Sequence, residues 1–280
     1  MIIFKHINGI SNYLHAVQKA GKSTGFVPTM GAMHKGHTSL LIKAKAESDI
    51  LVSSIFINPT QFNDPKDYEK YPVTIEKDIY LLEKAGCDVL FLPSILEIYP
   101  EGAVASKHYE LGYLETILDG AYRPGHFQGV CQVVEKLLTI IHPDKLFLGQ
   151  KDYQQCMVLK KLVALMHCQT TVIMCATQRE TDGLAMSSRN MRLTEADRKK
   201  APLIYENLNL IKQNIKPGSL NSLKKSTINY LTTKGFKVDY VEIADANSLT
   251  LIETWDGKTA LVALAAAFIN EVRLIDNLLL

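Results

Sequence analysis

The sequence predicts an α/β fold, with a parallel sheet in a larger first domain and a smaller α+β domain after it. Short apolar runs rich in Val, Ile, Leu and Phe alternate with amphipathic stretches through the first two thirds of the chain. This alternation is typical of a parallel sheet that helices cover on both faces. The chain has 280 residues, of which 47% are hydrophobic, so both domains can bury a core.

Five apolar runs are the expected strands of the parallel sheet, because each is short and rich in strand-forming residues. They are 25–28, 50–57, 89–93, 145–148 and 171–175. The segments between them predict helices, since apolar residues recur there at steps of three and four. One such helix is expected between 72 and 86, another begins near Gly36, and a third at 128–140 ends before Pro143.

A polar stretch, TQRETDGLAMSSRNMRLT, follows the fifth strand and offers few residues to a core. We place the domain boundary here, with a Rossmann-like domain at 1–176 and an α+β domain at 177–280, and Gly183 as a flexible point. Thr194 and Asp197 are typical of a helix start in the second domain. Helices are expected there at 195–213 and 219–234, and strands at 238–243, 260–267 and 272–275.

Composition argues against several classes of protein. Thirty-one basic residues against 29 acidic ones give a net charge of +2 without any basic block, so we expect no nucleic-acid partner. The five cysteines include no CxxC pair, which predicts reduced thiols in a cytoplasmic protein and no structural zinc site. No segment runs 18 apolar residues without a charge, and the start lacks a cleavage site, so we expect neither membrane insertion nor export.

The strongest candidate for chemistry is FVPTMGAMHKGH, where the first expected strand meets its helix. Strand-to-helix turns of parallel sheets bind anions, because backbone N–H groups and the helix dipole meet there. His34 and His37 share one helix face and can both donate to phosphate oxygens, while Gly31 and Gly36 allow close approach. We therefore expect the phosphates of a nucleoside triphosphate at this turn.

Three other segments carry polar side chains at or near strand ends. Lys151 suits phosphate and Asp152 suits a ribose hydroxyl or magnesium, although an ordinary solvated turn is the alternative. The triplet 187–189, Ser-Ser-Arg, can grip phosphates from a mobile loop, although most such triplets are simply loop. Asn58 and Gln61 can both donate and accept, which suits a small acid, unless they form only an Asn-Pro turn. No GxxxxGK[ST], GxGxxG or GxSxG motif is present, so the chemistry must come from electrostatics around phosphate.

The histidine pair and the later Met-Ser-Ser-Arg resemble the HxGH and KMSKS-like elements of the nucleotidyltransferase superfamily that includes class I aminoacyl-tRNA synthetases. More narrowly, five segments in order resemble the pantothenate synthetase (pantoate–β-alanine ligase) family. They are PTMGAMHKGH, FINPTQF, YRPGHFQGV, LGQKDYQQ and DGLAMSSRN, with a weaker match in ALVALAAAFINEVRLIDN.

The resemblance implies a homodimeric enzyme that converts ATP and (R)-pantoate to pantoyl adenylate and pyrophosphate. The amine of β-alanine then attacks to give pantothenate and AMP, and Mg²⁺ accompanies the ATP. The first domain would bind nucleotide and pantoate, and the second would act as a lid. The protein ligands of Mg²⁺ stay unassigned.

The resemblance also implies site residues. His37, His34 and Lys151 would be catalytic. Gln61, Gln155 and Asn58 would bind substrate, and Arg123 would contact substrate or a neighbouring loop. The ATP contacts would be Met30, Gly31, Ala32, Met33, His34, Lys35, Gly36, His37, Gly149, Gln150, Lys151, Asp152, Gln178, Met186, Ser187, Ser188 and Arg189.

Two questions stay open at this point. His37 matches the family's proton donor, but pyrophosphate leaves easily, so we favour a cationic imidazole that only stabilises charge. The helix after Tyr71-Pro72-Val73 departs from the family pattern, in which arginine commonly follows the Tyr-Pro pair, so no metal or β-alanine role is assigned to it.

Two other functions compete with the ligase. Another nucleotidyltransferase could couple a different acid, but the amides of Asn58, Gln61 and Gln155 argue against it. A nucleotide-sensing module without catalysis would be expected to lose part of the phosphate-binding set, and the chain keeps both histidines, Lys151 and Arg189.

Overall fold

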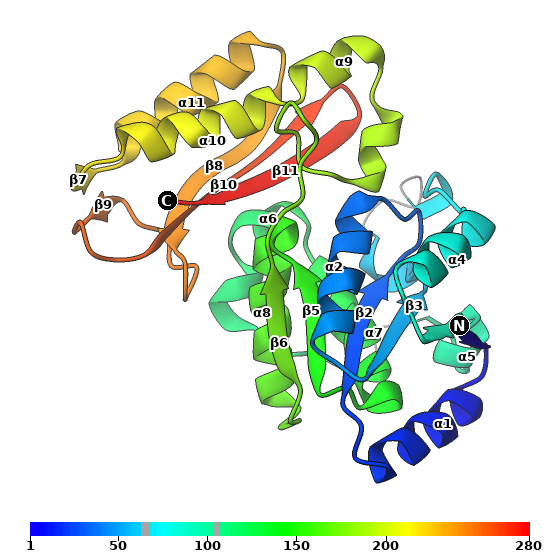
Figure 1. Ribbon diagram of the computed structural model, residues 1–280. Helices are drawn as coiled ribbons and strands as arrows, with labels where there is room; N and C mark the ends of the chain where they lie inside the picture. Colours follow the sequence, from blue (N-terminus) through cyan, green and yellow to red (C-terminus); the bar gives the residue numbers. More distant parts are fainter. Residues whose placement is uncertain (63–67, 104–106) are drawn as a thin grey trace. The chain divides into compact units, whose positions relative to one another are not determined.

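The computed structural model describes residues 1–62, 68–103 and 107–280, and they form two compact units (Figure 1). The first unit comprises Met1–Gly149 and Val158–Cys175, and the second comprises Gln150–Met157 and Ala176–Leu280. The short segment Gln150–Met157 therefore belongs with the second unit although it comes earlier in the chain. None of the described helices is both long and apolar enough to cross a membrane.

A six-stranded parallel sheet in the order β1-β4-β3-β2-β5-β6 forms the first unit. The α/β class and all five expected strands are confirmed, with ends that differ by one or two residues. The edge strand β1 was not expected, because three residues are too few for a pattern. The strands are β1 (Ile2–Phe4), β2 (Thr24–Thr29), β3 (Ile50–Ile55), β4 (Val89–Phe91), β5 (Lys145–Gly149) and β6 (Thr171–Cys175).

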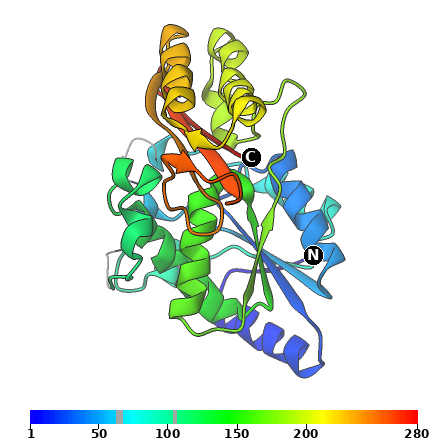
Figure 2. The same cartoon turned by 90° about the vertical axis from the view of Figure 1, so that its left-hand side faces the viewer.

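Helices lie on both faces of this sheet. Helix α2 (Lys35–Ala46) packs on β2, β3 and β5 and contacts α4 (Ile75–Lys84). Figure 2 shows the sheet nearly edge on, with the blue α2 on one side and green helices on the other. Helix α1 (Ile7–Lys19) contacts α7 (His126–Ile141). The remaining helical elements up to β6 are η1 (Pro59–Gln61), α5 (Ile95–Ile98), η2 (Gly112–Glu115), α6 (Leu118–Tyr122), η3 (Gln150–Asp152) and α8 (Tyr153–Leu165).

The strand order reverses beside β2. The chain passes from β2 to β3 on one side, and β5 later joins β2 on the other, through pairs such as Gly25 with Lys145. In doubly wound sheets, such a reversal opens a crevice at the carboxyl ends of the two central strands, and ligands bind there. The turn after β2, which carries the histidine pair, starts at this point.

The second unit packs two helices on a three-stranded antiparallel sheet of order β11-β10-β8. Its core contains fully buried leucines of both helices, Leu208 and Leu231, and the alanine-rich middle of β10. The three expected strands are confirmed, and β11 continues four residues further than expected. The elements are η4 (Ser188–Arg192), α9 (Glu195–Lys200), α10 (Leu203–Asn214), β7 (Gly218–Ser219), α11 (Asn221–Thr233), β8 (Lys237–Asp245), β9 (Thr254–Trp255), β10 (Leu261–Ile269) and β11 (Val272–Leu279).

The single helix expected at 195–213 is wrong, because the structure contains two helices there. Pro202 has no N–H to donate and its ring would clash with the carbonyl of the preceding turn, so it interrupts a helix that would run through it. The N–H of Ala201 donates to the Asp197 carbonyl, and the ladder restarts where Glu206 donates to the Pro202 carbonyl. Thr194 caps the first of the two helices, as its position in the sequence predicted.

We expect Asp197→Asn to flatten the acid dependence of unfolding. The Thr194 hydroxyl and the Asn270 amide both donate to the Asp197 carboxylate at 2.8 Å and hold its pKa below the usual value. In the unfolded chain this carboxyl has a pKa of about 4, so its contribution to the free energy of unfolding is fully present above that pH. The contribution is lost as the pH falls toward the lower folded value.

Urea unfolding at pH 7 and pH 3 measures this effect. Glu195→Gln is the matched control, because it removes one charge from an exposed position of the same helical turn. The control should keep the native difference in unfolding free energy between pH 7 and pH 3. An unchanged difference in Asp197→Asn would contradict the prediction.

Candidate active site

The turn that follows β2 is built around Thr29 and Gly31. The Thr29 hydroxyl donates to the Ser54 carbonyl at 2.8 Å and accepts from the Gly31 N–H at 3.2 Å. Gly31 has φ of 83°, in the left-handed region, and a Cβ there would lie 3.0 Å from Asp78 Oδ2. Glycine is therefore required by both the backbone conformation and the space.

Asp78, in the first turn of α4, holds this turn from behind. Its side chain is 1% exposed, and its two oxygens accept from the N–H of Ala32 at 2.9 Å and of Met33 at 2.8 Å. The Thr74 hydroxyl adds a third donor at 3.0 Å. Sequence reasoning missed Asp78, although a charged residue one turn before the buried Leu82 was a signal that could have found it.

His34 and His37 form a reciprocal cap at the N-terminus of α2. His34 Nδ1 accepts from the Gly36 N–H at 3.1 Å, and His37 Nδ1 accepts from the His34 N–H at 3.3 Å. The two rings lie 4.1 Å apart between centroids. A ring that accepts at Nδ1 carries its proton on Nε2, so each imidazole is a neutral donor through Nε2.

The backbone N–H groups of the turn are largely occupied. Those of Gly31, Ala32, Met33, His34 and Gly36 donate within the protein. Our expectation that free backbone N–H groups would favour an anion here is therefore wrong for these five residues. The helix dipole and the imidazole N–H groups are the features that favour an anion at this turn. Lys35, the first residue of the helix, is exposed.

Gln61, at the end of η1, contacts two other candidates. Its Nε2 lies 3.0 Å from Met30 Sδ, and its Oε1 lies 3.2 Å from Asn58 Nδ2. Asn58 is 1% exposed, donates to the Gly129 carbonyl and accepts from the Tyr99 hydroxyl at 2.8 Å. Its amide is thus bonded at both ends inside the protein, which makes it a support for Gln61 in this structure.

The backbone of Gln61 is fixed from α7. Arg123 Nη1 donates to His126 Nε2 at 3.0 Å, so His126 carries its proton on Nδ1 and donates it to the Gln61 carbonyl at 2.8 Å. Gly129, one turn later, allows α7 to touch η1, since a Cβ there would overlap the Thr60 carbonyl. Sequence reasoning missed His126, and it assigned Arg123 to a substrate or loop contact.

A cavity of about 240 Å³ lies beside the Met30 turn. Its lining is largely apolar and includes Gly31, Ile55, Thr74 and Asp78. Neither histidine nor Gln61 lines it, so we assign no substrate to this cavity.

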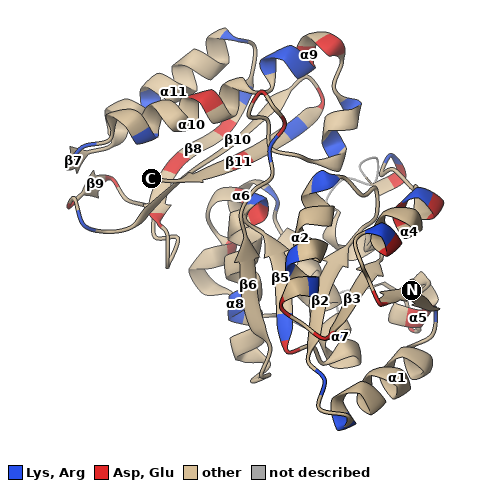
Figure 3. Ribbon diagram, in the orientation of Figure 1, with Lys and Arg blue, Asp and Glu red and all other residues tan. Residues whose placement is uncertain are grey.

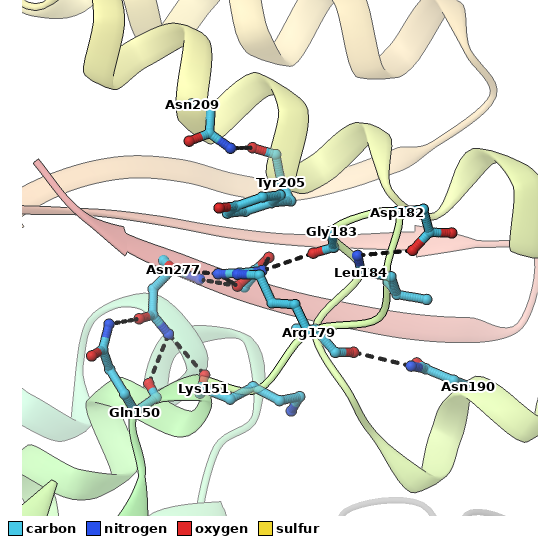
Figure 4. Close-up of polar contacts among 12 residues, drawn as sticks. Gln150, Lys151, Arg179, Asp182, Gly183, Leu184, Asn190, Tyr205, Asn209 and Asn277 are labelled. Atoms are coloured by element: carbon cyan, nitrogen blue, oxygen red, sulfur yellow. Dashed lines mark hydrogen bonds and ion pairs between the residues drawn. The ribbon is translucent and has the colours of Figure 1, made fainter. Parts of the chain in front are cut away.

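The candidates of the second unit lie in η3 and in the segment before η4. Lys151 Nζ is 3.3 Å from Asp152 Oδ1, and their side chains are 17% and 46% exposed. The Asn277 amide donates to the carbonyls of Gln150 and Lys151, both at 2.9 Å (Figure 4). Gly149, the last residue of β5, immediately precedes this turn.

Arg179 organises the segment that carries Gln178 and Met186. Its guanidinium makes a bidentate ion pair with Asp276, at 2.6 and 3.0 Å, and donates to the Gly183 carbonyl. It also stacks 3.7 Å from the centre of the Tyr205 ring, as Figure 4 shows. Burial raises the pKa of the Asp276 carboxyl, and Arg179 acts in the opposite direction.

The remaining candidates are placed by backbone bonds. The Met186 N–H donates to the Gln178 carbonyl at 3.0 Å, and the Ser187 hydroxyl accepts from the Arg189 N–H and so caps η4. Ser188 is buried, Gln178 is exposed and Gln155 is half-buried. Gly183, expected to be a flexible point, has φ of 92° and packs against Tyr205.

Charged side chains lie on both units, and some of them are of types that can bind a metal (Figure 3). No group of three His, Cys, Asp or Glu that could hold a metal occurs within 1–62, 68–103 and 107–280. On the face drawn in Figure 3, basic and acidic residues are interspersed on the helices of each unit.

Comparisons with known proteins agree on one family. The sequence model of the Pantoate-beta-alanine ligase family matches residues 2–279. A pantothenate synthetase of Cytophaga hutchinsonii is 43% identical over 100% of this chain and 99% of its own length, and one of Porphyromonas gingivalis is 41% identical over 99% of each.

Solved structures give the same result. Pantothenate synthetase from Thermus thermophilus superposes with a TM-score of 0.90 at 37% identity and covers 99% of each chain. The pantoate-beta-alanine ligase of Francisella tularensis, complexed with beta-gamma ATP and beta-alanine, gives 0.83 at 40% identity over 100% of this chain and 97% of its own.

We expect Asp78→Asn to destabilise the protein and reduce turnover. An asparagine can accept from one of the two N–H groups of Ala32 and Met33, but its own amide N–H₂ then faces the other. A buried donor left without an acceptor costs about 1–3 kcal/mol of unfolding free energy. Displacement of the turn should lower kcat/KM for ATP at least about tenfold, because catalysis depends on close positioning.

Chemical denaturation and steady-state kinetics test this prediction together. Glu76→Gln is the control, since it changes an exposed acid in the same helical turn and should leave both quantities unchanged. Native stability and native kcat/KM in Asp78→Asn would show that the carboxylate does not hold the turn.

Proposed function

The chain belongs to the pantoate–β-alanine ligase family and catalyses the ATP-dependent ligation of pantoate and β-alanine to pantothenate, and we propose that it does so through a pantoyl adenylate. The pantoate carboxylate attacks the α-phosphorus of ATP, and the bond to the pyrophosphate oxygen breaks. The amine of β-alanine then attacks the acyl carbon, loses a proton and displaces AMP. Neither step requires a nucleophile from the protein.

The observation that carries this proposal is the histidine cap of α2. Charge develops on the phosphate oxygens in the first step, so donors fixed toward those oxygens lower its barrier. The cap uses both Nδ1 atoms, and we assign the Nε2–H groups of His34 and His37 as the donors to phosphate at the positive end of the helix dipole. The same cap supports a neutral His37, because a cationic ring would carry a proton on Nδ1 and lose its bond to the His34 N–H.

The other site residues divide into substrate contacts and supports. We assign Gln61 and Gln155 to pantoate, and Gln61 in turn to β-alanine. Asn58 and Arg123 hold Gln61 in place, since the bonds to Gly129, Tyr99 and His126 occupy them. We assign further ATP contacts to Met30–His37 and Gly149 of the first unit and to Gln150–Asp152, Gln178 and Met186–Arg189 of the second.

Mg²⁺ fits this scheme as a companion of the nucleotide. The described residues supply no three-residue cage, and Mg²⁺ commonly keeps several waters and binds through phosphate oxygens. Bound there, it neutralises phosphate charge. The exposed Asp152 carboxylate is a candidate for one further contact, as is a ribose hydroxyl. A homodimer in the cytoplasm remains a prediction from the family.

We expect pyrophosphate release to need ATP and pantoate but not β-alanine in a single turnover. Multiple turnovers should need both acids and yield AMP and pantothenate in equal amounts. Quenched-flow and product chromatography measure these quantities, with pantoate omitted as the control. Formation of ADP, or of pyrophosphate without pantoate, would refute the adenylate route.

We also expect the variants His37→Gln and His37→Asn to differ in their rate of adenylate formation. The glutamine amide reaches near the position of imidazole Nε2 and can still donate to phosphate, whereas the asparagine amide lies near Nδ1. The rate of adenylate formation should stay within about tenfold of the native rate in His37→Gln and fall about 100-fold in His37→Asn, the usual effect of one lost donor.

The native rate should be independent of pH between about 6 and 8. A rate that falls as pH rises through about 6.5 would indicate the cation, and equal losses in both variants would indicate proton transfer.

A further inference from the structure

Asn277, in the edge strand β11, is a buried amide whose bonds are directed at one turn. It is 2% exposed, and its Nδ2 donates to two successive carbonyls, those of Gln150 and Lys151. Its Oδ1 accepts from Gln150 Nε2 at 3.1 Å. Only a side-chain amide offers two donors and an acceptor in one plane, so neither aspartate nor leucine can replace these bonds.

The strand does not need this side chain to stay in the sheet. β11 pairs with β10 continuously from Val272 to Leu279, and apolar residues of its first half enter the core of the unit. Buried and less buried residues alternate from Val272 to Ile275, and the alternation then stops at two successive buried polar residues, Asp276 and Asn277. Two buried polar groups in a row are costly in a strand unless each makes specific bonds.

Asp276 bonds to the segment that follows β6 and carries Gln178 and Arg179. Its carboxylate pairs with Arg179, next to Gln178, and accepts from the Asn277 N–H at 2.7 Å. Arg179 also donates to the Asn277 carbonyl at 3.2 Å. Two adjacent residues of β11 thus bond to different segments. Asn277 holds the backbone of η3, and Asp276 holds the Arg179 side chain.

We propose that Asn277 is a positioning residue for ATP, which fixes the backbone of Gln150 and Lys151 so that the Lys151 ammonium is held where it meets phosphate. The proposal rests on the proposed role of Lys151. Asn277 itself does not touch the nucleotide.

Calorimetric titration with the β,γ-methylene analogue of ATP tests the proposal in the full-length protein. We expect Asn277→Ala to raise the Kd about tenfold, since a displacement of about 1 Å is enough to lose a directed contact. Lys151→Ala should raise the Kd by a similar factor, and the double variant should bind no more weakly than Lys151→Ala alone. Titration with pantoate in the absence of nucleotide should give the native Kd in Asn277→Ala. Asn277→Asp, which keeps the size and loses both donors, provides a second variant if the alanine variant folds poorly.

Asp239→Asn is the matched control for a loss of buried polar contacts. The Asp239 carboxylate, in β8, is 8% exposed and pairs at 2.8 Å with Arg273, which lies in β11 like Asn277. The variant therefore breaks a comparable contact to the same strand. We expect it to lower the melting temperature as much as Asn277→Ala does, with an unchanged Kd for the analogue. A native Kd in both Asn277 variants, additive effects in the double variant, or a weakened Kd in Asp239→Asn would overturn the proposal. A native Kd in Lys151→Ala would refute the proposed role of Lys151 and the positioning role with it.

Discussion

The carboxylate of Asp78 holds the turn after β2 in a conformation that the turn could not keep by itself. Ala32 has φ of 49°, a left-handed conformation that costs a non-glycine residue about 1–2 kcal/mol. Two short bonds from the backbone to Asp78 offset this cost. The start of α2, and with it the placement of His34 and His37, follows from that conformation. A residue of α4 therefore determines where the two histidines lie.

The same arrangement recurs at the other segments. Behind Gln61 stand Asn58 and His126, and behind Lys151 stands Asn277, each buried and each bonded to main-chain carbonyls. The side chains of Asn58 and Asn277 carry no charge, so they fix geometry through hydrogen bonds alone. The proposed adenylate route forms no covalent intermediate with the protein, so it depends on such rigidity to hold the reactants.

The sequence predicted most of the sheet, because parallel strands buried on both faces are continuous apolar runs. It did not predict β1 and α1, since the pattern near residues 2–19 is short and mixed, and it joined α9 to α10 across Pro202. The candidate residues next to strand ends, such as His34 and Gln61, could be named because motifs are local. His126 and Arg179 could not, because their roles exist only where segments distant in sequence meet. Asp78 was missed although its place one turn before the buried Leu82 was a signal, and the predicted ligand Asn58 has the bonds of a support in this structure. The residues that actually bind ATP and pantoate stay a prediction.

The long sequence separation between bonded partners also means that different parts of the structure can form at different times during synthesis on the ribosome. The strand β2 pairs with β5, and a bond from Thr24 to Asp144 spans 120 residues. The turn at Gln150 receives its last bonds from a residue 127 positions further on. At ordinary rates of synthesis this interval lasts on the order of ten seconds. A nascent chain can therefore close its parallel sheet while the turn that carries Lys151 still lacks its bonds to Asn277.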